Sequence, residues 1–139
     1  MTTSNKGIEF ITSFESLQLS AYKALPTEKY YTIGYGHYGE DVTADMKITI
    51  NKAKELLKSD LTKFEGYVNK LNLAINQNQF DALVSFTYNC GPKNLHKLVL
   101  GRTLSQIADD MPLYCKAGGK ELRGLKRRRE AERKLFLEV

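Results

Sequence analysis

The sequence predicts a mostly helical α+β domain in which a small β-subdomain interrupts a series of helices. Over most of the chain, apolar residues recur at intervals of three and four, as on the buried faces of amphipathic helices. Residues 24–43 instead carry aromatic and β-branched residues broken by glycines, a pattern typical of short strands and tight turns. A chain of 139 residues suits one hydrophobic core, so we expect a single domain over residues 1–139.

Helical periodicity predicts a helix on each side of the β-subdomain. The first runs from Ser4 to about Tyr22, with Thr3 or Ser4 available as its N-cap. The second begins after Thr49 and keeps its period as far as Leu71, which predicts a long connecting helix.

Three further helices are expected in the second half of the chain. Asn76 and Gln79 form a capping-box pattern at the start of one, and Gly91-Pro92 ends it. A shorter helical stretch follows Thr103 and ends at Pro112. A basic amphipathic helix from Leu122 to about Leu137 completes the chain.

The charge and the cysteines restrict the function classes only broadly. A net charge of +5 favours an anionic partner, and nucleic acid, an acidic membrane face and the bacterial cell wall all qualify. Cys90 and Cys115 lack metal-ligand spacing, so free thiols are expected, with one disulfide as the alternative. The opening residues do not resemble a signal peptide, and no apolar run is long enough to cross a bilayer.

Glu15 is the first candidate for chemistry. It follows Ile8 by seven residues and Ile11 by four, which on a helix places its carboxyl group inside the apolar arc. Desolvation there would raise its pKa, as a general acid requires near neutral pH. The alternative is that Glu15 lies at the border of the apolar stripe and pairs with an Arg or Lys.

Several segments, in this order, resemble the phage-type lysozymes of glycoside hydrolase family 24. The first is Phe14-Glu15-Ser16-Leu17-Gln18-Leu19 with Ala21-Tyr22-Lys23, followed by Tyr31-Thr32-Ile33-Gly34-Tyr35-Gly36-His37. The resemblance continues through residues 76–86 and 88–91, and near the end through Gly118-Gly119-Lys120 and Gly124-Leu125 ahead of residues 127–132. It therefore covers nearly the whole chain.

This resemblance implies a lysozyme-like fold, in which the β-subdomain and a helical lobe flank a cleft for bacterial peptidoglycan. It implies hydrolysis of the β-1,4 bond between N-acetylmuramic acid and N-acetylglucosamine, without a cofactor, by a monomer. Glu15 matches the family's general acid, and Thr32 matches the threonine that helps to hold the attacking water. Attack from the face opposite the leaving sugar predicts inversion of configuration.

The sequence departs from the family pattern at Ala24. Many members carry an Asp there, so the second catalytic side chain is absent. Glu28 is the nearest replacement, although it also fits an exposed turn residue, and Asp41 is a more distant candidate. The alternative function is a peptidoglycan-binding module of the same fold with weakened catalysis.

The family pattern also implies sugar contacts by Tyr38, Tyr88 and Asn89, although tyrosines at helical spacing are equally typical of a core. His37 is expected to make a structural hydrogen bond or ion pair. His96 is isolated, and the sequence predicts no metal site.

The basic run at residues 126–129, with Arg123 and Arg133, fits a nucleic-acid patch, a membrane-seeking face or a solvated helix. We favour cell-wall binding by some of these arginines, because Glu130 and Glu132 weaken the nucleic-acid interpretation. We expect no stable membrane insertion. The family resemblance implies synthesis in the bacterial cytoplasm and action in the periplasm or cell wall, after release through a holin pore or a secretion machine.

Overall fold

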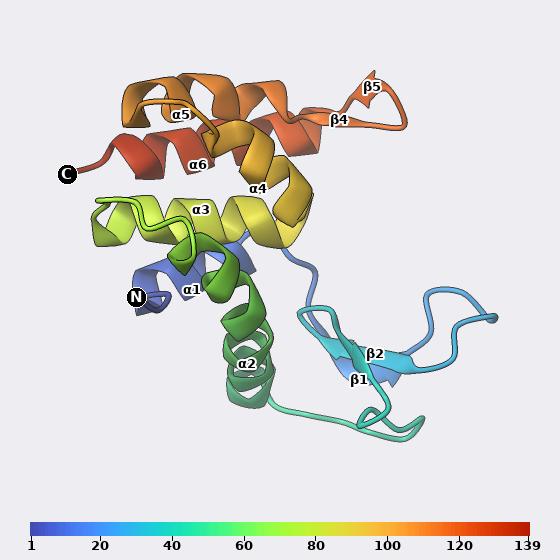
Figure 1. Ribbon diagram of the computed structural model, residues 1–139. Helices are drawn as coiled ribbons and strands as arrows, with labels where there is room; N and C mark the ends of the chain where they lie inside the picture. The colour runs from blue at the N-terminus through green and yellow to red at the C-terminus, as the bar shows by residue number, and fades with distance from the viewer. The chain divides into compact units, whose positions relative to one another are not determined.

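The computed structural model describes residues 1–139 and contains six α-helices, one 3-10 helix and five short strands (Figure 1). In chain order these are α1 (Asn5–Thr12), β1 (Gln18–Tyr22), β2 (Tyr31–Gly34), β3 (His37–Gly39), α2 (Ile50–Asn69), α3 (Gln77–Cys90), α4 (Pro92–Val99), α5 (Leu104–Asp110), η1 (Met111–Leu113), β4 (Lys116–Ala117), β5 (Lys120–Glu121) and α6 (Arg123–Leu137). The chain forms two compact units, which we call the sheet unit (Ile8–Thr62) and the helical unit (Met1–Gly7 with Lys63–Val139).

The sheet unit is built on a three-stranded antiparallel sheet in the order β1-β2-β3. Thr32 in the central strand lies opposite Tyr22 of β1 and Tyr38 of β3. The outer edge of β1 is covered by residues 46–48, because the Ala21 N–H donates to the Met46 carbonyl at 3.0 Å and the Ile48 N–H donates to the Leu19 carbonyl at 2.9 Å. All three strands are therefore fixed in register.

One face of this sheet packs against α2. Ile33 of β2 is fully buried, as is Ala53 in the first turns of α2. Gly34 has a φ of +69°, and a Cβ added there would lie only 3.4 Å from the Cβ of Ala53. The left-handed backbone conformation favours glycine at this position, and the strand lies in van der Waals contact with the helix.

The first helix is shorter than expected, and the β-subdomain begins earlier. Helix α1 ends at Thr12 instead of near Tyr22, and β1 starts at Gln18 instead of residue 24. The hydroxyls of Thr12 and Ser13 donate to the carbonyls of Glu9 and Phe10 at 3.0 and 2.6 Å. Such side-chain bonds compete with the backbone bonds that would extend a helix. At its start, Ser4 is the N-cap, since its Oγ accepts from the Gly7 N–H at 3.0 Å.

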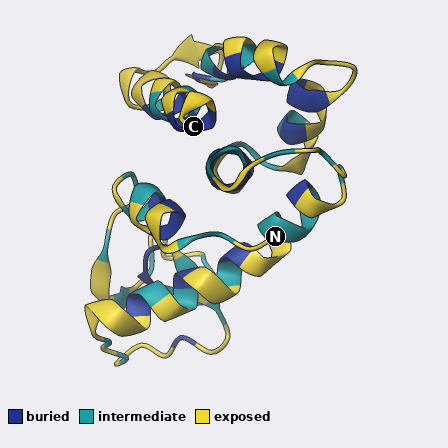
Figure 2. Ribbon diagram, turned by 90° about the vertical axis from the view of Figure 1, so that its left-hand side faces the viewer, coloured by how far each residue is buried: buried dark blue, intermediate teal, exposed yellow.

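In the helical unit, α3 is the most buried element. Every residue from Phe80 to Thr87 is buried, so α3 is enclosed on all sides and not only on the one face that the apolar period predicts (Figure 2). Asn76 and Gln79 form the expected capping box, and α3 ends at Gly91, whose φ is 86°. Helix α6 packs along α3, and its Leu135 and Phe136 are buried.

Two elements of the helical unit were not predicted from the sequence. Pro92 does not only end α3; it also opens α4, where a residue without an N–H is tolerated. Gly118 and Gly119, with φ of 58° and 78°, form the turn of the short β4–β5 hairpin. The helices after Thr49, Thr103 and Leu122 begin as expected. None of the helices combines the length and apolar character needed to cross a lipid bilayer.

Candidate functional site

Glu15 lies in the connection between α1 and β1. Its backbone N–H donates to the Thr12 carbonyl at 3.3 Å, in the turn that follows the helix. The side chain is half-buried. The helical-wheel argument that placed Glu15 in the apolar arc of a helix is wrong, because α1 ends three residues earlier. The residue stands instead on a short link into β1, the strand beside the one that carries Thr32.

Thr32 lies in the middle of the sheet with its side chain away from α2. Residues directly opposite each other in an antiparallel sheet project from the same face, and neighbours along a strand project from opposite faces. Ile33 and its partner His37 face α2, so Thr32 faces the other way with Tyr22 and Tyr38. The Thr32 hydroxyl makes no hydrogen bond within the protein and is half-buried. It is therefore available to bind a water molecule.

The loop between β1 and β2 carries the departure at Ala24. Ala24 is exposed and offers no functional group, whereas Glu28 is half-buried. The Glu28 N–H donates to the Leu25 carbonyl at 3.1 Å, which fixes a turn. The Glu28 carboxylate has no ion-pair partner. Glu28 is therefore free of ion pairs and remains a candidate to replace the missing Asp.

Tyrosines surround this loop and the strands beside it. The rings of Tyr30 and Tyr38 meet edge to face with centroids 5.6 Å apart, and the Tyr30 N–H donates to the Tyr38 hydroxyl at 3.2 Å. Tyr22 is 39% exposed and Tyr38 is 47% exposed. The face that carries Thr32 therefore presents aromatic side chains to solvent on both neighbouring strands.

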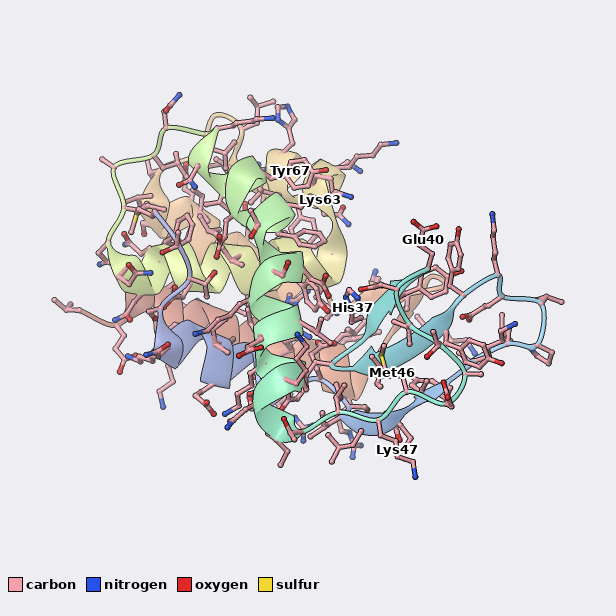
Figure 3. The ribbon with its side chains drawn as sticks, turned by 90° about the horizontal axis from the view of Figure 1, so that it is seen from below. His37, Glu40, Met46, Lys47, Lys63 and Tyr67 are labelled. Atoms are coloured by element: carbon pink, nitrogen blue, oxygen red, sulfur yellow. The ribbon has the colours of Figure 1, made fainter.

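His37 is held between two carboxylates, as the sequence predicts for a structural residue. Its Nδ1 lies 2.9 Å from Asp60 on α2, and its Nε2 lies 2.8 Å from Asp41. Figure 3 shows its side chain between the sheet and α2. Burial would lower the pKa of His37, but the hydrogen bonds and charges of Asp41 and Asp60 outweigh it and raise the pKa. The same pairing lowers the pKa of Asp41 and commits its carboxylate, which argues against Asp41 as the replacement for the missing Asp.

Tyr88 and Asn89 belong to the helical unit, at the end of α3. Tyr88 is half-buried, and its ring meets Phe64 edge to face with centroids 5.2 Å apart. Asn89 is exposed and lines a hollow of about 380 Å³ together with Cys90 and Tyr114. Sugar binding by Tyr88 and Asn89 stays a prediction.

The sequence analysis missed a buried ionic cluster in the helical unit. Arg128 and Arg129 are 3% and 0% exposed, so the expectation that these two arginines lie on a solvated basic face is wrong. Glu132, also fully buried, lies 2.6 Å from Arg129 and accepts a 2.6 Å hydrogen bond from the Ser85 hydroxyl. The spacing did carry a signal: Arg128, Arg129 and Glu132 continue the three-to-four period of the apolar residues of α6.

Both cysteines are free, as expected. The Cys90 thiol contacts the Arg129 guanidinium, yet burial outweighs this charge and raises the pKa of Cys90. It is therefore protonated at neutral pH and a poor nucleophile. No three His, Cys, Asp or Glu side chains are grouped so that they could hold a metal ion.

Comparisons with known proteins agree with these features. The Phage lysozyme family matches residues 12–132. The chain is 50% identical to an endolysin of Bacillus phage PZA, over 98% of this chain and 55% of the relative. It is 37% identical to an endolysin of Salmonella phage P22, over 99% of both proteins. It thus spans about half the length of the Bacillus phage protein and nearly all of the Salmonella phage protein.

Solved structures give the same result. The muramidase domain of SpmX from Asticaccaulis excentricus superposes on the chain with a TM-score of 0.84, at 35% identity over 99% of both chains. A P22 lysozyme mutant superposes with a TM-score of 0.81, at the same identity and coverage. The expected lysozyme-like, mostly helical α+β fold is confirmed, and the chain belongs to the phage lysozyme family.

Proposed function

We propose that this chain hydrolyses the β-1,4 bond between N-acetylmuramic acid and N-acetylglucosamine in bacterial peptidoglycan, as a monomer. In this proposal Glu15 protonates the leaving sugar oxygen as the general acid, and the Thr32 hydroxyl holds the water that attacks the anomeric carbon. One proton passes from Glu15 to the leaving oxygen, and the water gives one proton to the Glu28 carboxylate as its oxygen bonds to the anomeric carbon. Attack from the opposite face inverts the configuration.

The observation that carries this proposal is the environment of Thr32. A hydroxyl in the middle of a rigid sheet, with no hydrogen-bond partner in the protein, keeps both its donor and its acceptor capacity for a water. Glu15 is half-buried in the connection that leads into the adjacent strand. Membership of the phage lysozyme family supports the same assignment.

Glu28 is proposed as the group that polarises the attacking water in place of the Asp missing at Ala24. Its carboxylate is uncommitted, whereas that of Asp41 is held by His37. The aromatic face around Thr32 supports a sugar-binding role for Tyr38, since tyrosine rings stack on the apolar faces of sugars. Tyr88 and Asn89 are proposed as further sugar contacts from the helical unit.

The first experiment measures clearing of a peptidoglycan suspension by the purified chain and by Glu15→Gln. We expect the substitution to reduce the rate at least about 100-fold, because glutamine has no proton of suitable acidity to donate. Glu40→Gln is the matched control, since Glu40 is an exposed carboxylate of the same unit, and its rate should stay within about twofold. Equal rates for Glu15→Gln and the parent would exclude Glu15 as the acid.

Mass spectrometry of the released fragments identifies the bond. Reducing-end muramic acid supports a muramidase, whereas an anhydro product or free peptides would contradict it. Delivery through a holin pore or a secretion machine stays a prediction, tested by the lysis of cells that express the chain with and without a holin.

The second candidate is a peptidoglycan-binding module with weakened catalysis. The observation that favours it is the exposed Ala24, which supplies no second carboxylate. The variant Glu28→Gln tests whether Glu28 replaces the missing carboxylate. A fall of about tenfold or more in the clearing rate would assign the water-polarising role to Glu28. Binding to peptidoglycan without clearing by the parent chain would favour the module.

A further inference from the structure

The positive charge of the chain is concentrated in one unit. The helical unit holds 15 Lys and Arg against 8 Asp and Glu, a net charge of +7, whereas the sheet unit holds 6 against 8, a net charge of −2. Two of the cations, Arg128 and Arg129, are buried around Glu132 and do not face solvent. The remaining excess lies on the surface of the helical unit.

The β4–β5 hairpin leads directly into α6 (Figure 1). These elements carry five exposed cations, which we call the basic surface: Lys116, Lys120, Arg123, Lys126 and Arg127. Residues 123, 126 and 127 are spaced three and four apart, so they project from one side of the helix. The hairpin adds Lys116 and Lys120 from opposite faces, because Lys116 lies opposite Glu121 and Lys120 lies opposite Ala117. An ion pair of 3.4 Å between Lys126 and Glu121 ties the hairpin to the first turns of α6.

Few of these charges are paired within the folded chain. Glu121 is the only carboxylate paired with the basic surface, and the other four cations have no ion-pair partner. The first turn of α6 has no acidic residue, and no side chain caps its N–H groups. Cations near the start of a helix oppose the helix dipole, so their position is locally unfavourable. Because these charges do not stabilise the fold, binding to a partner outside the chain explains their position better.

We infer that the basic surface binds a linear phosphodiester polymer attached to the bacterial cell wall, such as a polyol-phosphate chain. The inference rests on the proposed function, because such polymers are held next to the peptidoglycan that the chain would cleave. Guanidinium groups bind phosphate oxygens in a paired geometry, and several cations in one region match successive phosphates. Residues 115–127 contain no Phe, Tyr or Trp, so the hairpin and the start of α6 supply no stacking partner of the kind typical of single-stranded nucleic-acid sites.

The test measures binding of the full chain to purified poly(glycerol phosphate) by calorimetry, at several salt concentrations. We compare the parent with the triple variant Lys120→Gln/Arg123→Gln/Arg127→Gln. These three side chains are exposed, so the fold should be retained, which circular dichroism checks. We expect Kd to rise about tenfold near 0.1 M salt, and the dependence of binding on salt to weaken, because fewer counterions are released.

A matched control removes the same charge from the sheet unit. The variant Lys47→Gln/Lys52→Gln/Lys58→Gln also loses three exposed cations, and its Kd should stay within about twofold of the parent value. Equal losses of affinity in both variants would mean that only the net charge matters. That result would overturn the proposal of a defined binding surface. Tighter binding to duplex DNA than to the polymer at equal phosphate concentration would also overturn the proposal, in favour of a nucleic acid.

A separate assay keeps this inference distinct from the proposed hydrolysis. Clearing of walls that carry the polymer should fall about fivefold or more in the basic-surface variant, whereas clearing of walls stripped of polymer should not change. Equal losses on both substrates would contradict the inference, because the surface would then act on peptidoglycan itself. If the parent clears neither substrate, the proposed hydrolysis fails, and the calorimetry still decides whether the polymer binds.

Discussion

Asp60→Asn should destabilise the chain in a manner that depends on pH. His37 is only 15% exposed, and its Nδ1 lies 2.9 Å from the Asp60 carboxylate on α2. This contact fastens β3 to the helix behind the sheet. Asparagine keeps the size of the side chain and removes its charge, so the substitution tests the ionic part of the contact.

The sign of the pH dependence follows from the two pKa shifts. The pKa of His37 is raised from 6.5, so its contribution to stability is complete below pH 6.5 and is lost as the pH rises through the folded-state value. The pKa of Asp41 is lowered from 3.8, so its contribution is present above that pH and is lost as the pH falls through its own folded-state value. Both contacts of His37 therefore stabilise the fold in the pH range between the lowered pKa of Asp41 and the raised pKa of His37.

The free-energy cost of Asp60→Asn should lie between the contributions of exposed and of buried ion pairs. Exposed ion pairs contribute about 0.2–1 kcal/mol, and hydrogen bonds to charged groups contribute about 1.5–3 kcal/mol. Because the Asp60 side chain is 30% exposed, we expect Asp60→Asn to cost about 1–2 kcal/mol at pH 5.5. As the pH rises through the raised pKa of His37, the cost should fall, and by pH 9 we expect it to be below about 0.5 kcal/mol.

Urea unfolding at the two pH values measures these differences. Glu55→Gln is the control on the same helix: Glu55 is 71% exposed and lies 3.8 Å from Lys52, so its cost should stay below about 0.5 kcal/mol at both pH values. A penalty for Asp60→Asn that is equal at pH 5.5 and pH 9 would refute the argument, because the contact would then owe nothing to the charge of His37.

Three other predictions concern the helical unit, each measured by urea unfolding. Arg129→Met should cost about 3–5 kcal/mol, because it leaves the buried Glu132 short of a counter-charge, and adding Glu132→Met should restore part of the loss; no recovery would contradict the buried pair. Gly91→Ala should cost about 1–2 kcal/mol through its φ of 86° alone, since nothing lies within 4 Å of an added Cβ; an unchanged midpoint would contradict this. Asn76→Ala should cost about 1 kcal/mol by removing the cap of α3, and a neutral result would show that the capping box contributes nothing.

The sequence predicted well those elements whose ends are set by local chemistry. The capping boxes at Asn76 and Thr103 fix the starts of α3 and α5, and the conformation of Gly91 fixes the end of α3. These signals act within four residues, so they can be recognised without the fold. By contrast, the start of β1 depends on its pairing with β2, from which it is separated by a loop of eight residues. Phe14 and Leu17 continue a helical spacing after Thr12, although they lie in the turn and link that lead into β1.

The candidate site was predicted only in part for a related reason. The family motif points to Glu15 and Thr32 as candidates, but the expected burial of Glu15 on a helix depended on a helix that ends before that residue. The choice between Glu28 and Asp41 needed the fold, since only the structure shows that Asp41 is bound to His37. The separation of Glu28 and Asp41 from Ala24 along the sequence does not show which of the two carboxylates already pairs with another side chain.

The arginines of α6 show why charge alone misleads. Consecutive cations indicate a solvated face, yet a helix turns by about 100° per residue, so neighbours in sequence face different environments. Arg127 is exposed, whereas Arg128 and Arg129 enter the interior, where Glu132 balances part of their charge. Burying charged groups costs free energy, and the ion pairs of Glu132 with both arginines offset part of that cost. The Ser85 hydroxyl and Cys90 thiol supply contacts to this cluster, so α3 and α6 require each other's polar residues as well as their apolar ones.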